Sequence, residues 1–147
     1  MSLAIAEKKL PLWFWIAAGL GLVWNVYGVY QFQGSVFGSQ ADLMAQGMTA
    51  AQAQAYAAIP LWMNLAFAVG VFGGLIGSGL LMLRNRLATP VFAASLAGYV
   101  VLYIGDITEG IFAVMGAPQV IVLTVVVLIA AGLLWMSRRF ERDGMLA

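Results

Sequence analysis

The stretch 60-PLWMNLAFAVGVFGGLIGSGLLML-83 decides the fold of this chain. It contains no charged residue, and it exceeds the ~20 residues that an α-helix needs to cross ~30 Å of hydrocarbon. It also begins with a proline, which suits the first turn of a helix because the missing N–H has no intrahelical partner there. The stretch therefore predicts a transmembrane helix.

Three more apolar runs repeat this layout. They are Pro11–Phe32, Pro90–Phe112 and Pro118–Met136, and with Pro60–Leu83 they place every one of the four prolines at the start of a run. We therefore predict an all-α membrane protein, an antiparallel four-helix transmembrane bundle formed by one domain over residues 1–147. The expected spans are about 11–32, 60–83, 90–112 and 118–136.

The composition agrees with a membrane protein and excludes several chemistries. Of the 147 residues, 63% are hydrophobic and 9% charged, and the mean hydropathy is +0.96. A soluble domain carries about 25% charged residues. The absence of Cys and His removes disulfides, zinc–thiolate and iron–sulfur sites and the usual general base, so we expect no metal and no cofactor. A net charge of +1 argues against a nucleic-acid partner.

The basic residues predict the orientation. All seven fall on one side of a four-span arrangement, which the positive-inside rule assigns to the cytoplasm together with both termini. They are Lys8, Lys9, Arg84, Arg86, Arg138, Arg139 and Arg142. The first run is too long for a signal peptide and no small-residue cleavage site follows it, so we expect an uncleaved first span.

The segment between the first two runs, about 34–59, is expected to form short helices on the outer membrane surface. Ser39 can cap one helix that ends at Gly47, and Thr49 with Gln52 has the spacing of a capping box. Leu43 is expected to be exposed there. Docking of this segment on a partner protein is the alternative.

Small residues recur along two of the runs and predict close helix contacts. On the second run they are Ala66, Gly70, Gly73, Gly74, Gly77 and Ser78, and on the first Ala17 and Gly21. Such residues let helix backbones approach closely in lipid. The stripe either packs inside one bundle or forms the interface with a second copy or another membrane subunit.

Two carboxyl groups are the strongest functional signal. Asp106 and Glu109 are separated by three positions on the third run, so a continuous helix points both the same way. A rise of 1.5 Å per residue from Pro90 puts Asp106 roughly 24 Å from the cytoplasmic face. Asn25, Asn64 and Thr124 reach a similar depth on the other runs, which predicts one polar cluster in the outer leaflet.

Three interpretations of this cluster remain open. The polar groups can be structural, can form a ligand or proton site that faces outward, or can meet a cation of another chain. No Lys or Arg of this chain reaches Asp106, so its carboxyl is expected to be protonated, hydrated from outside or paired in trans. Of the aromatic residues, Tyr27 belongs to an outer interfacial belt, whereas Trp24 and Tyr99 lie deeper and are interpreted as packing residues.

Two motifs and the four-proline layout carry a resemblance. The motifs are Val71-Phe-Gly-Gly-Leu-Ile-Gly-Ser78 and Pro90-Val-Phe-Ala-Ala-Ser-Leu-Ala-Gly98. The chain resembles a group of small, uncharacterised bacterial four-span inner-membrane proteins, some of which carry the label "sugar transporter". This resemblance implies a bacterial cytoplasmic membrane.

Our leading hypothesis is an accessory or scaffolding subunit of a larger membrane complex, or a homo-oligomer, with the lipid bilayer as its other partner. The alternative is a small, oligomeric transporter coupled to protons through Asp106 or Glu109. The inner halves of the runs contain few polar residues, which disfavours a carrier that must bind its substrate from both sides. An enzyme is not expected, because two carboxyls and some amides provide few groups that can take part in catalysis.

Overall fold

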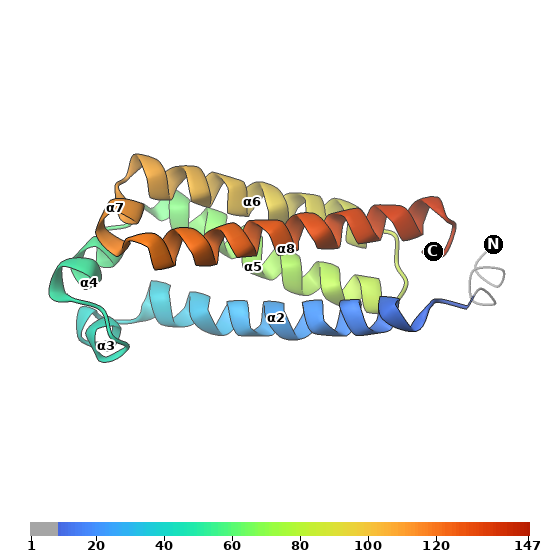
Figure 1. Cartoon of the computed structure of the whole chain (residues 1–147), viewed down its shortest axis with the longest axis horizontal. Coiled ribbons are helices and arrows are strands. Elements are labelled where there is room, and N and C mark those ends of the chain that lie inside the picture. The colour runs from blue at the N-terminus through green and yellow to red at the C-terminus, as the bar shows by residue number, and fades with distance from the viewer. Residues whose placement is uncertain (1–8) are drawn as a thin grey trace.

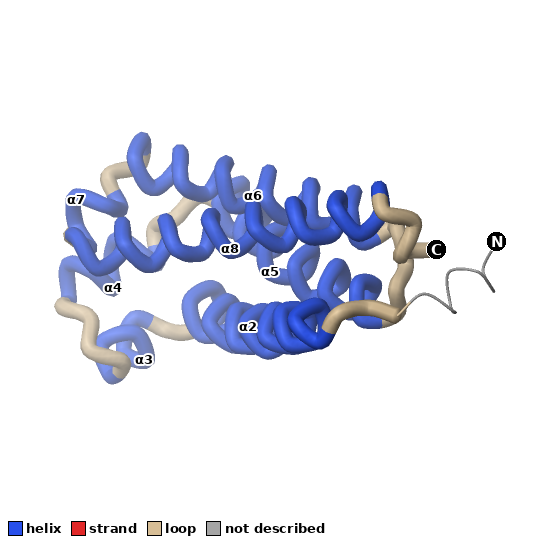
Figure 2. Tube along the Cα trace, turned by 45° about the vertical axis from the view of Figure 1, so that its right-hand side comes forward, coloured by secondary structure: helices blue, strands red, loops and turns tan. Residues whose placement is uncertain are grey.

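A computed structural model describes residues 9–147 as a bundle of helices (Figure 1). The four long helices are α2 (Leu12–Phe37), α5 (Leu61–Met82), α6 (Ala88–Thr108) and α8 (Ala117–Arg142). The three short helices are α3 (Gln40–Ala45), α4 (Ala50–Ala57) and α7 (Ile111–Met115). Residues 9–147 contain no strand (Figure 2). The four long helices are each long and apolar enough to cross a membrane, which confirms the coarse prediction of an all-α multi-pass fold.

The prolines lie where the long helices begin. Pro11 and Pro60 are the N-caps of α2 and α5, and Pro118 lies in the first turn of α8. Pro90 is the third residue of α6, which begins two residues earlier than its run predicts. In the first turn a missing N–H removes no intrahelical hydrogen bond, so all four positions tolerate proline.

The bundle has two distinct ends. Helices α3, α4 and α7 lie together at one end, the cap end, whereas residues 83–87 and 143–147 lie at the other (Figure 1). At this second end the backbone N–H of Ala147 donates to the oxygen of Arg84 over 2.7 Å. All six basic residues within 9–147 precede α2, follow α5 or lie in the last turns of α8, so we call it the basic end.

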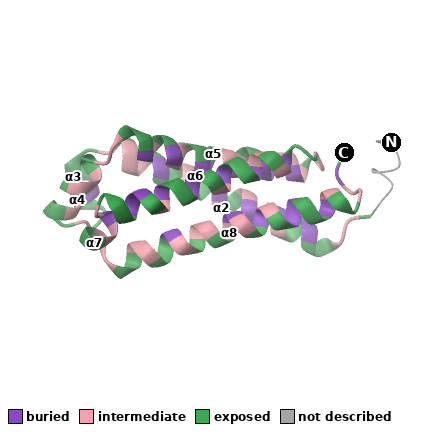
Figure 3. Cartoon of the chain, turned by 90° about the horizontal axis from the view of Figure 1, so that it is seen from above, coloured by how far each residue is buried: buried purple, intermediate pink, exposed green. Residues whose placement is uncertain are grey.

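The outward faces of the long helices are exposed (Figure 3), and large apolar side chains occupy them. Leu20 on α2, Leu61 on α5 and Leu128 on α8 are 65%, 72% and 65% exposed. A soluble protein rarely leaves large continuous apolar surface in water, whereas lipid tails solvate it without cost. The surface therefore fits a multi-pass membrane protein.

Helices α3 and α4 at the cap end each begin with a capping box, the one predicted at Thr49 and another at Ser39, which was predicted only as an N-cap. The Ser39 backbone N–H donates to Asp42 and the Asp42 N–H donates back to the Ser39 hydroxyl, over 3.0 and 3.1 Å. Thr49 and Gln52 exchange the same pair of bonds over 3.0 and 3.2 Å. The Ser39 backbone bond, followed by its hydroxyl, holds the pKa of Asp42 below its ordinary value. Leu43, expected to be exposed, is instead buried.

The third span is shorter than its apolar run. Helix α6 ends at Thr108, and Glu109 is its C-cap. Gly110 follows with a φ of +73°, a left-handed conformation that favours glycine and redirects the chain into α7. The prediction that the span continues to Phe112 missed this signal, because the apolar run passes through Gly110 without interruption.

Glycines let α5 and α6 pack closely at the centre of the bundle. A Cβ atom added at Gly70 would lie 2.6 Å from the Tyr99 ring, and one at Gly77 would lie 2.8 Å from the Phe92 ring. From α6, a Cβ on Gly98 would lie 2.7 Å from the backbone oxygen of Ala66. These separations are shorter than real carbon contacts, so only glycine fits without displacement at these positions.

The outer helices flank this central pair, α2 against α5 and α8 against α6 (Figure 1). Gly74 of α5 faces α2, where a Cβ would collide with the Asn25 amide. At the basic end α2 and α8 also meet, since the Phe14 and Phe140 rings have centroids 4.7 Å apart. A buried apolar core closes this end: Phe14, Ala18, Leu81, Phe92, Leu133 and Phe140.

Candidate functional site

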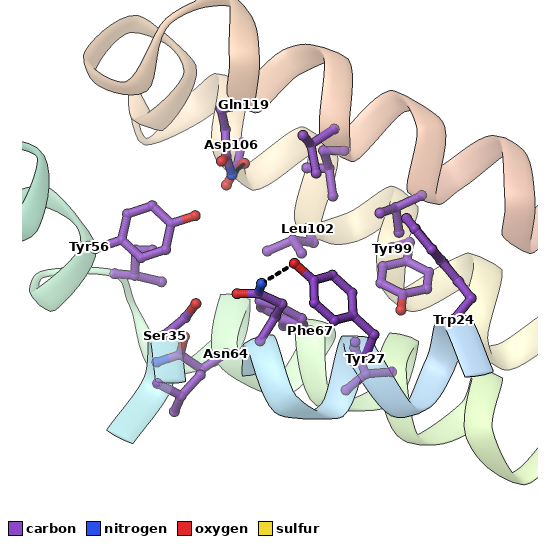
Figure 4. Close-up of a pocket in the computed structure, with 18 residues that line it drawn as sticks. Trp24, Tyr27, Ser35, Tyr56, Asn64, Phe67, Tyr99, Leu102, Asp106 and Gln119 are labelled. Carbon is purple, nitrogen blue, oxygen red and sulfur yellow. Dashed lines mark hydrogen bonds between the residues drawn. The ribbon is translucent and has the colours of Figure 1, made fainter. Parts of the chain in front are cut away.

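The cap-end half of the bundle contains a cavity of about 200 Å³ between the four long helices. Aromatic side chains from α2, α4, α5 and α6 form much of its wall (Figure 4). They are Trp24, Tyr27, Tyr56, Phe67 and Tyr99. The polar side chains of the wall are Gln31, Ser35, Asn64, Asp106 and Gln119. A mostly apolar wall with a few polar groups is typical of a small-molecule site.

Asp106 is the charged residue of this wall. It is 2% exposed, and the Gln119 Nε2 donates to its Oδ2 over 3.1 Å. Gly116, with a φ of +83°, turns the chain from α7 into α8 and so places Gln119 in the first turn of α8 opposite α6. Among residues 9–147 the carboxyl accepts a hydrogen bond from Gln119 alone, although a carboxylate has acceptor sites for about four.

Tyr56 covers the cavity from α4, with its hydroxyl directed inward (Figure 4). Burial raises the pKa of the Tyr56 phenol, and the Asp106 carboxylate acts in the same direction, whereas hydrogen bonding to Gln119 lowers it. The phenol therefore stays protonated at neutral pH and can act as a donor toward the cavity. The short helix α4 is thus part of the site's cover.

Two further polar groups of the wall are available to a ligand. Neither the Tyr99 hydroxyl nor the Asn64 amide hydrogen-bonds to another residue of the described chain, 9–147. No side-chain N or O that is fully enclosed within those residues lacks a partner, so both groups keep some exposed surface, and both residues line the cavity. Together with Asp106 they offer donors and acceptors from α5 and α6.

The cavity opens sideways between α2 and α8. Of its lining residues, Tyr27 and Gln31 on α2 and Val122 on α8 are exposed, at 52% for Tyr27 and 58% for Val122. Gln31 donates to the Tyr27 hydroxyl at this rim. All three residues belong to long apolar helices, so the opening lies along the side of the bundle rather than only at the cap end.

Only some residues of the predicted polar cluster lie together in the structure. Asp106 and Asn64 line the cavity together. Asn25 does not line it: its amide donates to Gly21 over 2.7 Å and to the Ser78 hydroxyl over 3.3 Å, which joins α2 to α5.

Thr124 and Glu109 also lie outside the cavity wall. The Thr124 hydroxyl donates to the oxygen of Val120 over 2.6 Å and lies 3.1 Å from that of Tyr103. Glu109 is exposed and is the C-cap of α6, so it lies at the end of the helix, beyond the cavity. Equal depth in the membrane therefore did not mean a common position around the bundle.

The structure places the predicted small residues against neighbouring helices of the same chain. Gly70, Gly73 and Gly77 face α6, and Gly74 faces α2. Ala66 and Ser78 are buried, Gly21 faces Leu133 of α8, and Ala17 packs against the core of the basic end.

Sequence reasoning missed Gln119 and Tyr56 and assigned only packing or interfacial roles to Trp24, Tyr27 and Tyr99. One signal was present: Gln119 is an amide next to Pro118, at the start of a span rich in Val, Ile and Leu. Tyr56 gave no comparable signal, because its position over the cavity depends on how α4 folds back.

Comparison of the chain with protein-family models, with curated proteins and with solved structures finds no match. The chemistry of the cavity is therefore the basis for a functional conclusion.

Proposed function

We propose that this protein is a small ligand-binding protein of the bacterial cytoplasmic membrane, which holds a partly apolar molecule in its cap-end cavity. The observation that carries the proposal is the cavity itself, with the buried Asp106 set among aromatic rings. A cavity of about 150 Å³ is enough for a benzene ring. The space of about 200 Å³ therefore suits one substituted ring or a short branched chain.

The proposed arrangement in the membrane is an antiparallel bundle with the basic end in the cytoplasm. The clustered arginines support it, because basic residues are enriched on the cytoplasmic side. Arg139 lies over the rings of Trp13 and Trp135, at 5.9 and 5.4 Å from their centroids, as expected for an interfacial layer. The cavity then belongs to the outer leaflet.

The closed basic end supports an accessory subunit that presents or senses its ligand within a larger complex. A carrier has to expose its site on both sides, and here Phe14, Phe92 and Phe140 fill the path toward the cytoplasm. Transport is the second candidate, because an outward-open carrier also presents such a cavity. The small-residue stripe supports neither, since it contacts helices of its own chain.

Photolabelling in native membranes tests the proposal. We expect a trifluoromethyl phenyl diazirine, a small apolar reagent that partitions into bilayers, to label Leu102 and Tyr99. These residues are 7% and 5% exposed, so lipid does not reach them except through the cavity. Peptide mapping by mass spectrometry locates the label.

A matched pair of variants separates the cavity from the lipid-facing surface. Val126→Trp places an indole in the cavity and should abolish labelling of Leu102, whereas Val125→Trp on the exposed side of α8 should leave it unchanged. Ile121, which is 62% exposed, reports labelling from lipid in both. Absence of label at Leu102 in the parent, or equal labelling in the two variants, contradicts the proposal.

A further inference from the structure

The charges around the cavity are not balanced within the part of the chain that the structure describes. Asp106 is an acid in its wall, and the six basic residues of 9–147 all lie at the opposite end of the bundle. A carboxylate in a low-dielectric site is costly unless a cation or several donors accompany it. Gln119 supplies one neutral donor, so the ionised form of Asp106 has no cation of the described chain to compensate its charge.

The rest of the cavity wall consists largely of aromatic side chains, with Tyr56 nearer to the carboxyl than Trp24 and Tyr99 (Figure 4). Trp24 and Tyr27 come from α2, Tyr56 from α4 and Tyr99 from α6, so rings surround the space on several sides (Figure 4). The face of an aromatic ring attracts an organic cation within about 6 Å of its centroid, most strongly when water is excluded. Quaternary ammonium groups are recognised by such aromatic cages. The rings and the carboxyl thus favour the same kind of ligand.

The position of the opening indicates where the ligand comes from. At the basic end α2 and α8 touch through Phe14 and Phe140, whereas toward the cap end the cavity lies between them, with the exposed Tyr27 and Val122 at its rim. A molecule dissolved in the outer leaflet reaches this rim directly. An amphipathic ligand fits, with its apolar part in lipid and its charge toward Asp106.

We propose that the ligand is a small lipophilic organic cation, an amine or quaternary ammonium with an aromatic or branched apolar group, that enters from the bilayer between α2 and α8. This inference rests on the proposed function, because it names the ligand class of the same cavity. Asp106 binds the positive charge, Tyr56 covers it from the cap end, and the rings of Trp24 and Tyr99, farther along the cavity, contact the apolar part of the ligand (Figure 4).

Competition against the photolabel at Leu102 tests this inference on the unmodified protein. The probes are benzyltrimethylammonium, its uncharged isostere neopentylbenzene and the anion phenylmethanesulfonate. We expect the cation to protect Leu102 at a concentration at least about tenfold below that of the neutral isostere. The two probes differ only in charge, so this difference measures the contact between the ammonium group and Asp106. The anion should not protect. The neutral isostere concentrates more strongly in the bilayer, so partitioning alone would make it the better protecting probe. Stronger protection by the cation therefore reports recognition of its charge.

Two carboxyl variants form the matched test on the protein side. Asp106→Asn keeps the size and the bond to Gln119 but removes the charge, and should weaken protection by the cation at least about tenfold. Glu109→Gln makes the same charge change on an exposed residue three positions away and should have no effect.

The outcomes distinguish the two proposals. Equal suppression of Leu102 labelling by all three probes, or protection by the cation that is unchanged in Asp106→Asn, overturns the cation inference and leaves the ligand-binding function in place. No labelling of Leu102 overturns both. If Asp106→Asn does not yield a folded protein, the three-probe comparison on the parent still decides.

Discussion

At the scale of single residues, Gln119 of α8 and Asp106 of α6 form a hydrogen-bonded pair in the cavity wall. The Gln119 amide nitrogen donates to the Asp106 Oδ2 over 3.1 Å. A buried donor or acceptor left without a partner costs its full desolvation penalty, whereas removing both partners together can be nearly neutral. Replacing one of the two partners should therefore destabilise the protein more than replacing both.

We expect Gln119→Leu to lower the stability of the protein by about 1–3 kcal/mol, because Asp106 loses its hydrogen bond. Asp106→Leu alone should also destabilise, since the Gln119 amide is then unpaired. The double variant should recover most of the loss. Thermal unfolding in mild detergent measures all three, and strictly additive effects would show that the two side chains do not interact.

Tyr56 gives a pH-dependent prediction. Burial raises the pKa of its phenol above the ordinary 10.0, so the folded protein favours the neutral form. The resulting contribution to stability is fully present below pH 10.0 and is lost as the pH rises through the raised pKa of the folded state. The melting temperature of the parent should therefore fall more steeply above this pH than that of Tyr56→Phe. Parallel curves for the two proteins would contradict burial of this phenol.

At the scale of helices, Gly98 sets the spacing of the central pair. Its virtual Cβ meets the backbone oxygen of Ala66 at 2.7 Å, and backbone cannot move aside as a flexible side chain can. The Ser95 hydroxyl, one turn earlier on α6, donates to Gly70 over 2.6 Å and depends on the same close approach. Loss of contacts between α5 and α6 lowers the stability of the bundle, because in lipid packing rather than hydrophobic burial holds helices together.

Gly98→Ala should therefore destabilise the bundle, measurably lowering its melting temperature. The control is Gly132→Ala on α8, where a Cβ meets no atom within 4 Å and alanine has the higher helix propensity. This control should be neutral or slightly stabilising. If both substitutions have the same effect in detergent unfolding, the close contact between α5 and α6 is not formed.

The elements were largely predictable from the sequence, and the site was predictable only in part. Prolines and capping boxes act over a few neighbouring residues, so Pro11, Pro60 and Ser39 located helix starts correctly. The angular position of a side chain around the bundle depends on tertiary packing, which sequence spacing does not contain. Depth along the helix therefore grouped Asn25 with Asp106, whereas the packing of α2 turned Asn25 toward Ser78.

At the scale of the whole molecule, the two halves of the bundle differ. The basic half is filled by an apolar core that includes Phe14, Phe92 and Phe140. The cap half keeps a cavity under α4, with an opening between α2 and α8. Which half faces the cytoplasm therefore decides from which leaflet a ligand arrives.

Single cysteines test this orientation directly, because the chain contains no cysteine of its own. Gln46→Cys and Gln54→Cys place exposed thiols at the cap end, and Leu87→Cys places one in the connection at the basic end. With the basic end in the cytoplasm, a membrane-impermeant maleimide added to intact cells should label the first two and not the third. Permeabilised cells provide the control, in which all three should react. Labelling of Leu87→Cys alone in intact cells would reverse the orientation, and the cavity would then receive its ligand from the inner leaflet.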